Sequence, residues 1–260
     1  MADTPLLRDF DQPIHTLVIG ATGGIGLALV EQLAANSQVA HLFAVARSTR
    51  RSAPLAALQA QHPDKIVLLD CDITDPAQLV TMVAALRRSV ATLHLVINTA
   101  GMLHDGALQP EKSLTQVSLA GLQQSFLINT FAPLLLAQAL LPLWRHAEPA
   151  VYASLSARVG SIGDNRIGGW YGYRAAKAAQ NQLLKTLSIE LTRINRRSIV
   201  LALHPGTTDT PLSKPFQGNV SAEKLFTPAF SAGALLAVIA QRTPPDSGSF
   251  YAWDGQPIVW

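Results

Sequence analysis

The feature that most constrains the fold of this chain is a repeated alternation between short apolar runs and segments with helical spacing. The apolar runs cover 15–20, 41–47, 65–70, 93–98, 149–156 and 198–204, and the helical segments cover 24–35, 53–61, 75–88, about 114–144 and 171–193. Nearly continuous apolar strands that alternate with helices predict a parallel sheet covered by helices on both faces. We therefore expect a single α/β domain over 1–260, with a doubly wound sheet that binds its ligand beyond the carboxyl ends of the strands.

The composition excludes several classes of protein. Hydrophobic residues make up 48% of the chain and charged residues 14%, which excludes intrinsic disorder. Cys71 is the single cysteine and the 7 histidines are scattered, so we expect no disulfide framework and no metal site. The N-terminus lacks a signal-peptide pattern, and the longest apolar stretch, 131–144, is shorter than the ~20 residues that span a bilayer. These features predict a soluble, cytoplasmic protein with no membrane contact.

The charge balance gives little support to a nucleic-acid partner. The formal net charge is +3, from 20 Lys and Arg against 17 Asp and Glu. A basic balance can indicate nucleic-acid binding, but such proteins concentrate the charge on a helix or an aromatic-interleaved patch. No such patch occurs in this sequence. We therefore expect no nucleic-acid partner.

A glycine-rich turn, Gly20-x3-Gly24-x-Gly26, follows the first apolar run. Glycines allow a sharp turn and a close approach to a pyrophosphate, which then faces the amides at the start of the helix. A tight strand-to-helix connection would contain the same residues, but the position after the first strand favours a dinucleotide site. The residues expected to contact the cofactor here are Gly20, Thr22, Gly23, Gly24, Ile25 and Gly26.

The end of the second strand carries arginines and no acid. It reads Ala46-Arg47-Ser-Thr-Arg50-Arg51. A site for NAD places an acid here for the ribose hydroxyls, whereas the 2′-phosphate of NADP favours an arginine. The alternative is a solvated basic loop, which is how we interpret Arg50 and Arg51. Arg47 predicts that NADP(H) is favoured over NAD(H).

Polar and small residues end the third and fourth strands. Asp72 could accept a hydrogen bond from the adenine amino group while Ile73 packs on the ring. Asp75 has the alternative role of capping the next helix. In the segment Asn98-Thr-Ala100-Gly101, small residues could leave room for a cofactor, although the segment alone would be interpreted as a turn.

Tyr173 and Lys177 are four residues apart at the start of a predicted helix, so they share one helix face. A free tyrosine, with a pKa of ~10, is a poor acid–base group near neutrality. A positive charge about 4 Å away is worth up to about 4 kcal/mol at an effective dielectric constant of about 20, and each pKa unit needs about 1.36 kcal/mol. Lys177 could therefore lower the pKa of the phenol. The alternative is a surface pair, because this spacing is common by chance.

Two further polar positions extend this candidate catalytic set. Ser156 ends the fifth strand and could polarise a substrate carbonyl, or it could be a strand-terminal hydroxyl bonded to the backbone. Asn129 lies in the otherwise apolar stretch 126–131. Buried amides need partners, so Asn129 is either a satisfied structural amide or part of a proton relay through water.

Together these motifs resemble the short-chain dehydrogenase/reductase family, over nearly the whole chain from His15 to Trp260. The resemblance rests on the glycine turn, Asn98-Thr-Ala-Gly101, Asn129, Ser156, Tyr173-x3-Lys177 and Pro205-Gly206. The segments 156–162 and 169–174 look like the branch that contains sniffer-type carbonyl reductases and the C-factor signalling protein.

The resemblance implies a Rossmann fold with strand order 3-2-1-4-5-6-7 and hydride transfer from a nicotinamide. It implies that Tyr173 donates the proton to the carbonyl oxygen, that Lys177 binds the nicotinamide-ribose hydroxyls, and that Asn129 holds a water linking Lys177 to solvent. Homodimers or homotetramers built on two long helices are also implied. The residues that would close over the nicotinamide and pyrophosphate are Pro205, Gly206, Thr207, Thr208 and Thr210.

The sequence departs from the family pattern at two places. The usual Asn-Asn-Ala-Gly has a threonine, Thr99, in its second position. Aligning Gly160 with the glycine that usually follows the catalytic serine places Ala157, and not Ser156, in the serine position. Ser156 is still the predicted catalytic serine, and Ser161, in a lengthened loop, is the substitute.

The combined prediction is an NADP(H)-dependent oxidoreductase that transfers hydride between nicotinamide and a small carbonyl or alcohol substrate, with Tyr173 as proton donor and acceptor. The alternative is a cofactor-binding sensor or signalling protein with little turnover, which the altered serine position favours. Loops 102–112 and 207–227 are expected to line the substrate pocket. The segment 204–227, rich in Pro, Thr, Ser and Lys, is the predicted lid.

Overall fold

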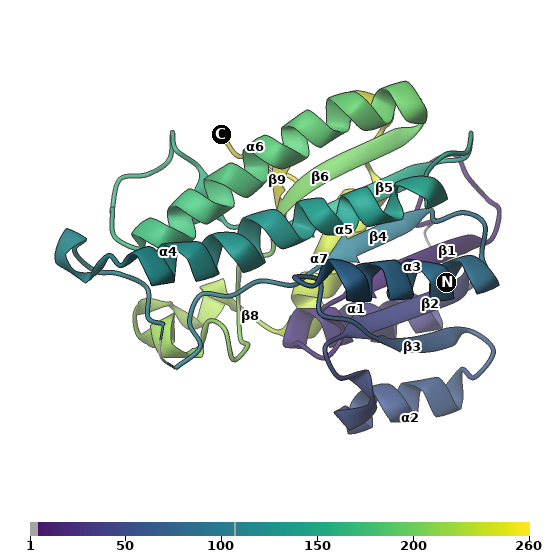
Figure 1. Ribbon diagram of the computed structural model, residues 1–260, viewed down its shortest axis with the longest axis horizontal. Coiled ribbons are helices and arrows are strands. Elements are labelled where there is room, and N and C mark those ends of the chain that lie inside the picture. Colours follow the sequence, from purple (N-terminus) through teal and green to yellow (C-terminus); the bar gives the residue numbers. More distant parts are fainter. Residues whose placement is uncertain (1–4, 107) are drawn as a thin grey trace.

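Seven parallel strands form the central sheet of the computed structural model, which describes residues 5–106 and 108–260 (Figure 1). Their order, β3-β2-β1-β4-β5-β6-β9, confirms the predicted Rossmann-type doubly wound sheet. Residues 1–4 of the predicted domain and residue 107 of the predicted pocket loop lie outside the described residues. The strands are β1 (Ile14–Ile19), β2 (Val39–Ala46), β3 (Ile66–Asp70), β4 (Leu95–Asn98), β5 (Ala150–Leu155), β6 (Ser198–His204) and β9 (Ser249–Ala252).

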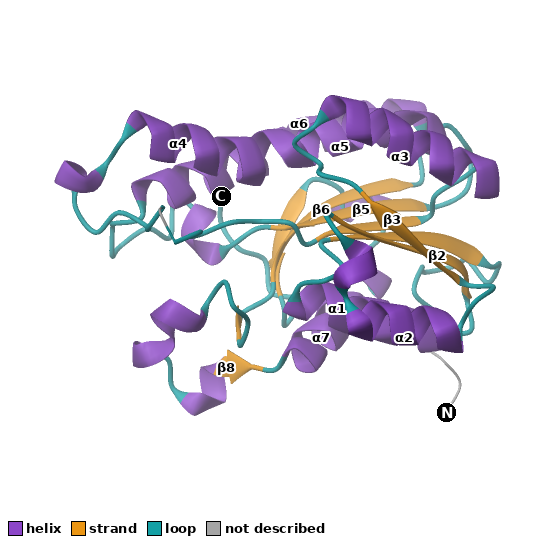
Figure 2. Cartoon of the chain, turned by 60° about the horizontal axis from the view of Figure 1, so that its bottom comes forward, coloured by secondary structure: helices purple, strands orange, loops and turns teal. Residues whose placement is uncertain are grey.

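Helices cover both faces of the sheet, and Figure 2 shows them as one layer above it and one below. One layer holds α1 (Gly24–Ala35), α2 (Ala53–Gln61) and α7 (Pro228–Ala240). The other holds α3 (Pro76–Ser89), α4 (Leu119–Phe126), α5 (Ala132–Leu140) and α6 (Tyr171–Ile194). Each layer buries its own hydrophobic cluster against the sheet, which explains why the strands are apolar on both faces.

The helix predicted at 114–144 begins later than expected and contains an irregular turn. Ser118 caps α4 by accepting a hydrogen bond from the Gly121 amide, so residues 114–116 form a separate 3-10 turn. A π-helical turn, Leu127–Phe131, joins α4 to α5. Such turns are rare and are frequently found at functional sites. This one contains Asn129, whose side chain is fully buried.

The same continuous helix, Leu119–Leu143, is long and apolar enough to cross a membrane, unlike the shorter stretch considered from the sequence. Length and composition are weak evidence, because core helices of soluble proteins share them. Here 44% of the apolar window is buried inside the protein, with Ala132, Leu136 and Leu140 packed in the core. The helix therefore has a structural role beside the sheet.

The apolar pattern missed the C-terminal elements α7 and β9. The sequence of α7, PAFSAGALLAVIA, is apolar on all sides and so lacks a clear helical period. Strand β9 is only 4 residues long. Within 204–227, two short strands, β7 (Thr207–Thr208) and β8 (Leu225–Phe226), pair with each other and bring the two ends of that segment together.

The glycine turn between β1 and α1 has no room for side chains. Gly20 has φ +80°, and a Cβ atom there would lie 2.5 Å from the Thr99 Oγ1. A Cβ atom on Gly26 would overlap the carbonyl oxygen of Gly20 and come within 3.0 Å of the same hydroxyl. Thr99 Oγ1 donates a hydrogen bond to the carbonyl of Ile19 at 2.7 Å, so it cannot easily move. The turn therefore depends on glycine for close packing as well as for its dihedral angles.

Four histidines lie in a row at the amino ends of the central strands. The ring centroids are 5.0 Å apart for His15 and His41, 5.3 Å for His15 and His94, and 5.7 Å for His94 and His146. Burial, followed by the charges of His94 and His41, lowers the pKa of His15 to about 4, although Glu148 opposes this. Burial also lowers the pKa of His94, whose Nε2 lies 2.8 Å from a carboxylate oxygen of Glu148. These two shifts favour the neutral forms of His15 and His94 near neutral pH.

We expect Gly26→Ala to lower the free energy of unfolding by about 1–3 kcal/mol, the usual cost of overpacking. Urea denaturation measures this change. Gly218→Ala is the matched control, because no atom lies within 4 Å of the Cβ position there. Equal losses in the two variants would contradict the packing argument.

The folded protein should lose stability as the pH falls from about 6.5 toward 4, because the unfolded chain then binds a proton that folded His15 resists. The contribution is about 2 kcal/mol, from about 1.36 kcal/mol per pKa unit with allowance for partial exposure. Denaturant titrations at several pH values measure it. His15→Gln should flatten this slope, and an unchanged slope would show that other groups cause it.

Candidate active site

The predicted glycine turn and the predicted lid meet at the carboxyl ends of β1 and β4, where the strand order reverses. A Cβ atom on Gly24 would lie 2.8 Å from the Thr210 methyl carbon, so the lid packs directly on the turn. Crevices at such a reversal are the usual ligand sites of doubly wound sheets. The structure thus brings together two segments that are far apart in the sequence.

The base of the lid is fixed by hydrogen bonds behind β6. The hydroxyl oxygens of Thr208 and Ser231 are 2.7 Å apart, and Ser231 donates to the carbonyl of Pro205 at 3.2 Å. Gly206 has φ +75°, and a Cβ atom there would strike the ring of Phe226. Thr207 pairs with Leu225 in the short β7–β8 ladder. The predicted nicotinamide-side residues therefore sit on an ordered base.

The end of β2 has no free acid. Asp70, at the end of β3, accepts hydrogen bonds from the Thr49 amide and hydroxyl at 2.7 and 2.6 Å. The Thr49 hydroxyl is the main reason that the pKa of Asp70 lies below its usual value. Arg47 is exposed, and within residues 5–106 and 108–260 it forms no ion pair. The guanidinium is thus available to an anion at this edge.

The side chains that follow β3 make more hydrogen bonds and core contacts within the protein than the sequence suggested. One carboxylate oxygen of Asp72 accepts from both the amide and the hydroxyl of Thr74, at 2.9 and 2.7 Å. Ile73 is 6% exposed and belongs to the core. Asp75 caps α3, as its alternative role predicted. The adenine contacts assigned to Asp72 and Ile73 stay predictions.

Gly101, Asn129 and Lys177 converge at the end of β4. A Cβ atom on Gly101 would lie 3.3 Å from Asn129 Oδ1 and 3.6 Å from Lys177 Nζ. Behind it, Asn98 accepts from the Ala100 amide at 3.1 Å, which fixes the turn that carries Gly101. A side chain at position 101 would therefore press on the Asn129 amide. The room for a cofactor that the small residues of this turn suggested stays a prediction.

Asn129 is held in place by the backbone of Met102. Its Oδ1 accepts from the Met102 amide at 2.9 Å, and its Nδ2 donates to the Met102 carbonyl at 2.8 Å. This is the satisfied structural amide, one of the two alternatives for the residue. The water relay stays a prediction.

Tyr173 and Lys177 lie in the first two turns of α6, and the Lys177 Nζ is 5.8 Å from the centre of the Tyr173 ring. The helix begins abruptly, because Trp170 adopts the left-handed conformation with φ +52°. The buried carboxylate of Glu111 then accepts a hydrogen bond from the Gly172 amide at 3.1 Å. A negative charge at a helix N-terminus is stabilising, so Glu111 helps to define where α6 starts.

Burial determines the pKa values of this pair. It lowers the pKa of Lys177, which is 2% exposed, to about 7. It raises the pKa of Tyr173 above its ordinary value, which differs from the depression expected from the sequence. Desolvation of the phenol is the cause of this increase.

Two residues that the sequence analysis overlooked hold Lys177 in position. Its Nζ donates to the Leu155 carbonyl and to Gln180 Oε1, both at 2.9 Å. Gln180 donates to Ser154 Oγ at 2.8 Å, and Asn98 donates to the same hydroxyl at 3.0 Å. The available sequence signal was that Gln180 follows Lys177 by three residues and so shares its helix face.

Neither candidate serine contacts Tyr173 through a hydrogen bond in the described structure. The Ser156 hydroxyl, which is buried, donates to Asn181 Oδ1 at 2.7 Å. The Ser161 hydroxyl donates to the Val259 carbonyl at 2.5 Å and accepts from the Asp164 amide. The proton of each hydroxyl therefore has an acceptor outside the candidate site, and a catalytic role for either one stays a prediction.

An aromatic group connects the predicted lid to α6. The ring of Trp170 lies 6.3 Å from that of Tyr173 and 5.1 Å from that of Phe216 in the lid. His104 contacts the Phe216 ring at 5.7 Å, and its Nε2 is 3.2 Å from the carbonyls of Pro211 and Leu212. The two loops predicted to line a pocket therefore touch each other. No cluster that could hold a metal ion occurs among the described residues.

Comparison with known proteins identifies the family of the chain. The family model for short chain dehydrogenase matches residues 15–220. The 1-hydroxy-2-glutathionyl-2-methyl-3-butene dehydrogenase of Rhodococcus sp. (strain AD45) is 33% identical over 192 residues, which are 73% of this chain and 78% of that protein. The C-signal protein of Myxococcus xanthus is 30% identical over 148 residues, which are 57% of this chain and 84% of that protein.

Solved structures give the same result. An NADPH-bound carbonyl reductase from chicken fatty liver has a TM-score of 0.84 and 30% sequence identity, covering 96% of this chain and 100% of that one. Carbonyl reductase Sniffer of D. melanogaster has a TM-score of 0.85 and 27% identity, with the same coverage. Because the family model spans most of the sequence and these structures align along nearly all of it, the chain belongs to the short-chain dehydrogenase/reductase family of nicotinamide-dependent oxidoreductases.

Proposed function

We propose that the protein is an NADPH-dependent carbonyl reductase that also runs in reverse as an alcohol dehydrogenase on small molecules. The observation that carries this proposal is the convergence of Tyr173, Lys177, Asn129 and Gly101 at the ligand end of the sheet. The ammonium and the phenol share a desolvated environment, and perturbed pKa values of this kind cluster at functional sites.

The residues divide the chemistry between them. A bound nicotinamide would supply the hydride, and Tyr173 would supply the proton, so that a carbonyl becomes an alcohol. In the reverse direction the Tyr173 phenolate would take the proton of the alcohol, and the oxidised nicotinamide would accept the hydride. Lys177 supports the phenolate form, since an ammonium near a phenol favours its ionisation once bound hydroxyls and the charged nicotinamide offset the desolvation. Asn129 and Gln180 hold the backbone and the ammonium in this arrangement.

Cofactor preference is proposed to depend on Arg47. Asp70 is already bonded to Thr49, and Arg47 has no carboxylate partner among the described residues. A guanidinium can bind a phosphate through two parallel hydrogen bonds, whereas a ribose hydroxyl offers it no charge. This favours the 2′-phosphate of NADP(H).

We also propose that 204–227 closes over the substrate as a lid within a single domain. Trp170, Phe216 and His104 would form its apolar contact with the substrate, next to the Tyr173 ring. The side chains of Leu119 in α4 and Phe131 at the start of α5 are exposed. They fit a homodimer or homotetramer formed through α4 and α5. A cytoplasmic location rests on the sequence features alone.

A cofactor-binding sensor with little turnover is the second candidate. The observation that favours it is that Ser156 donates its proton to Asn181, while Ala157 brings only a methyl group. A site without a serine hydroxyl would stabilise the developing charge on a substrate oxygen less well. Measured turnover distinguishes this candidate from the reductase.

Replacing Tyr173 with phenylalanine should reduce kcat for carbonyl reduction by roughly 100-fold to 10,000-fold, the usual contribution of general acid catalysis. NADPH binding, measured by fluorescence titration, should be unchanged, because only the hydroxyl is removed. Full turnover in this variant would refute the mechanism. No turnover by the wild type across a broad carbonyl panel, with tight NADPH binding, would favour the sensor.

Ser156→Ala is the comparison for this experiment. Because the hydroxyl bonds to Asn181, its removal should lower the free energy of unfolding by about 1 kcal/mol and leave most of the turnover. A loss of kcat as large as that of Tyr173→Phe, with unchanged stability, would instead assign Ser156 a catalytic role.

Arg47→Ala should weaken NADPH binding by roughly 10-fold to 100-fold, corresponding to the loss of charged hydrogen bonds worth about 1.5–3 kcal/mol. NADH binding should change little. Isothermal titration of both cofactors measures the difference. Arg51→Ala is the matched control, an exposed arginine from the same loop that should have no effect. A wild type without NADPH preference would overturn the assignment.

A further inference from the structure

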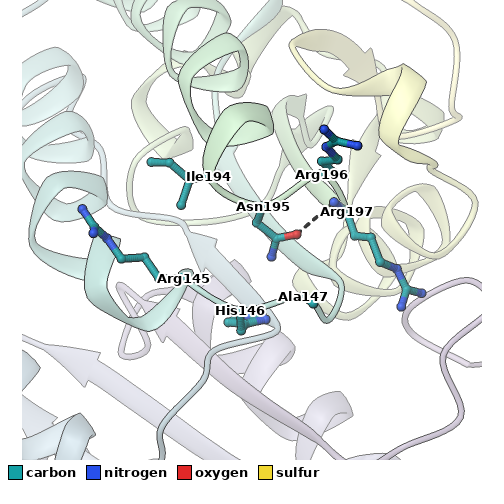
Figure 3. A pocket seen from close by; sticks show the side chains of 7 residues that line it. All are labelled: Arg145, His146, Ala147, Ile194, Asn195, Arg196 and Arg197. Atoms are coloured by element: carbon teal, nitrogen blue, oxygen red, sulfur yellow. Dashed lines mark hydrogen bonds between the residues drawn. The ribbon is translucent and has the colours of Figure 1, made fainter.

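A pocket lies at the opposite edge of the sheet from the candidate active site, at the amino ends of β5 and β6. Figure 3 shows it between the loop that follows α5 and the loop that joins α6 to β6. Its volume is about 650 Å³, which is within the usual size range of small-molecule sites. The candidate active site is at the carboxyl ends of the same strands. The two sites are therefore separate.

The pocket carries three arginines without a carboxylate partner. Figure 3 places Arg145 on one side and Arg196 and Arg197 on the other. Within 5–106 and 108–260, none of the three forms an ion pair. The nearby acid, Glu148, is bonded to His94. The Arg197 guanidinium, however, donates to the Asp9 carbonyl at 3.4 Å and lies 5.9 Å from the centre of the Phe10 ring. Arg145 and Arg196 are therefore the positive groups left for a ligand.

The loops that carry these arginines are held rigidly. Asn195 is buried, and its Nδ2 donates to the Glu148 carbonyl in the other loop at 2.9 Å. Its Oδ1 accepts from the Arg197 amide at 2.9 Å, the bond drawn in Figure 3. One amide side chain thus joins both walls of the pocket. A preformed site of this kind binds with a smaller ordering cost than a mobile one.

Unsatisfied polar atoms occur in or next to the lining segments of the sequence. Among the described residues, four buried side-chain polar atoms have no hydrogen-bond partner, and three belong to Trp144, His146 and Ser198. His146 lines the pocket, and the other two are adjacent to its lining residues in the chain. Most buried polar groups in proteins are paired, so exceptions that cluster need an explanation. The His146 Nε2 lies 3.3 Å from the Leu93 carbonyl, so the ring has a fixed position beside the pocket.

Helix dipoles alone do not account for the arginines. The 3-10 turn that follows α5 ends at Leu143 and α6 ends at Ile194, so two carbonyl ends, each with about half a negative charge, face this edge. Arg193 already lies in the last turn of α6, where that dipole is strongest. Arg145, Arg196 and Arg197 lie beyond the helix ends, and three full charges exceed the two partial ones.

We propose that this pocket binds a small phosphate-bearing anion. Guanidinium groups fork onto phosphate oxygens, and arginines on opposite walls can bind oxygens on different phosphate groups.

Inorganic pyrophosphate is the probe, with NMR of the histidine side chains as the readout. His146 is identified from its signal loss in His146→Gln. Its signals should move saturably at constant ionic strength. The readout is local to this pocket, so it does not depend on the proposed reductase activity.

The double variant Arg145→Ala/Arg196→Ala should weaken this binding at least tenfold, because two charged hydrogen-bonding groups are lost. Arg145→Lys/Arg196→Lys keeps both positive charges but removes the planar guanidinium groups, so it should give an intermediate loss of affinity. The matched control is Arg87→Ala/Arg88→Ala, two exposed arginines in the last turn of α3. Unmoved His146 signals with millimolar pyrophosphate, equal movement with sodium chloride, or unchanged affinity in the double alanine variant would each overturn the proposal.

Discussion

The burial of the Lys177 ammonium is the constraint on which the candidate active site depends. Removing an ammonium from water is costly unless its N–H groups find acceptors. Two of the three donors are satisfied by Leu155 and Gln180, and burial still lowers the pKa of the ammonium to about 7. In the proposed function, the third donor binds hydroxyls of the cofactor. The contacts that β5 and α6 make with Lys177 thus hold a group whose charged form is costly to bury.

Much of the fold could be predicted because its strands are apolar on both faces, and the strand ends therefore marked where functional residues occur. The glycine turn, Tyr173 and Lys177 were found in this way, and the structure places each at the expected edge. Element α7 was missed because it is apolar all round, so no period distinguishes its faces. Gln180 and the left-handed Trp170 were missed because their roles depend on contacts between distant segments.

The prediction of Ser156 as the catalytic serine shows that motif spacing does not determine where a side chain points. Side chains alternate along a strand, so Ser154 and Ser156 point to the same side of β5. Both are bonded to residues of α6, Ser154 to Gln180 and Ser156 to Asn181. By the same alternation, Ala157 points to the other side, and its methyl group cannot donate a hydrogen bond. A hydroxyl close in sequence to the expected position is therefore directed into the contact between helix and sheet, and only coordinates reveal this.

Helix ends of opposite partial charge face an anion at the two ends of the parallel strands. At the carboxyl edge, α1 begins directly after the glycine turn, so free amides and a positive helix end attract a phosphate without any cation. At the amino edge, helices end, and their carbonyls repel anions. Arginines confined to the last helical turn would only neutralise those carbonyls. Arg145 and Arg196 lie past the helix ends and lack carboxylate partners in the described chain, so their charge exceeds what the helices require. In our proposal, this excess positive charge lets the amino ends of the strands attract an anion, as the helix N-terminus does at the carboxyl ends.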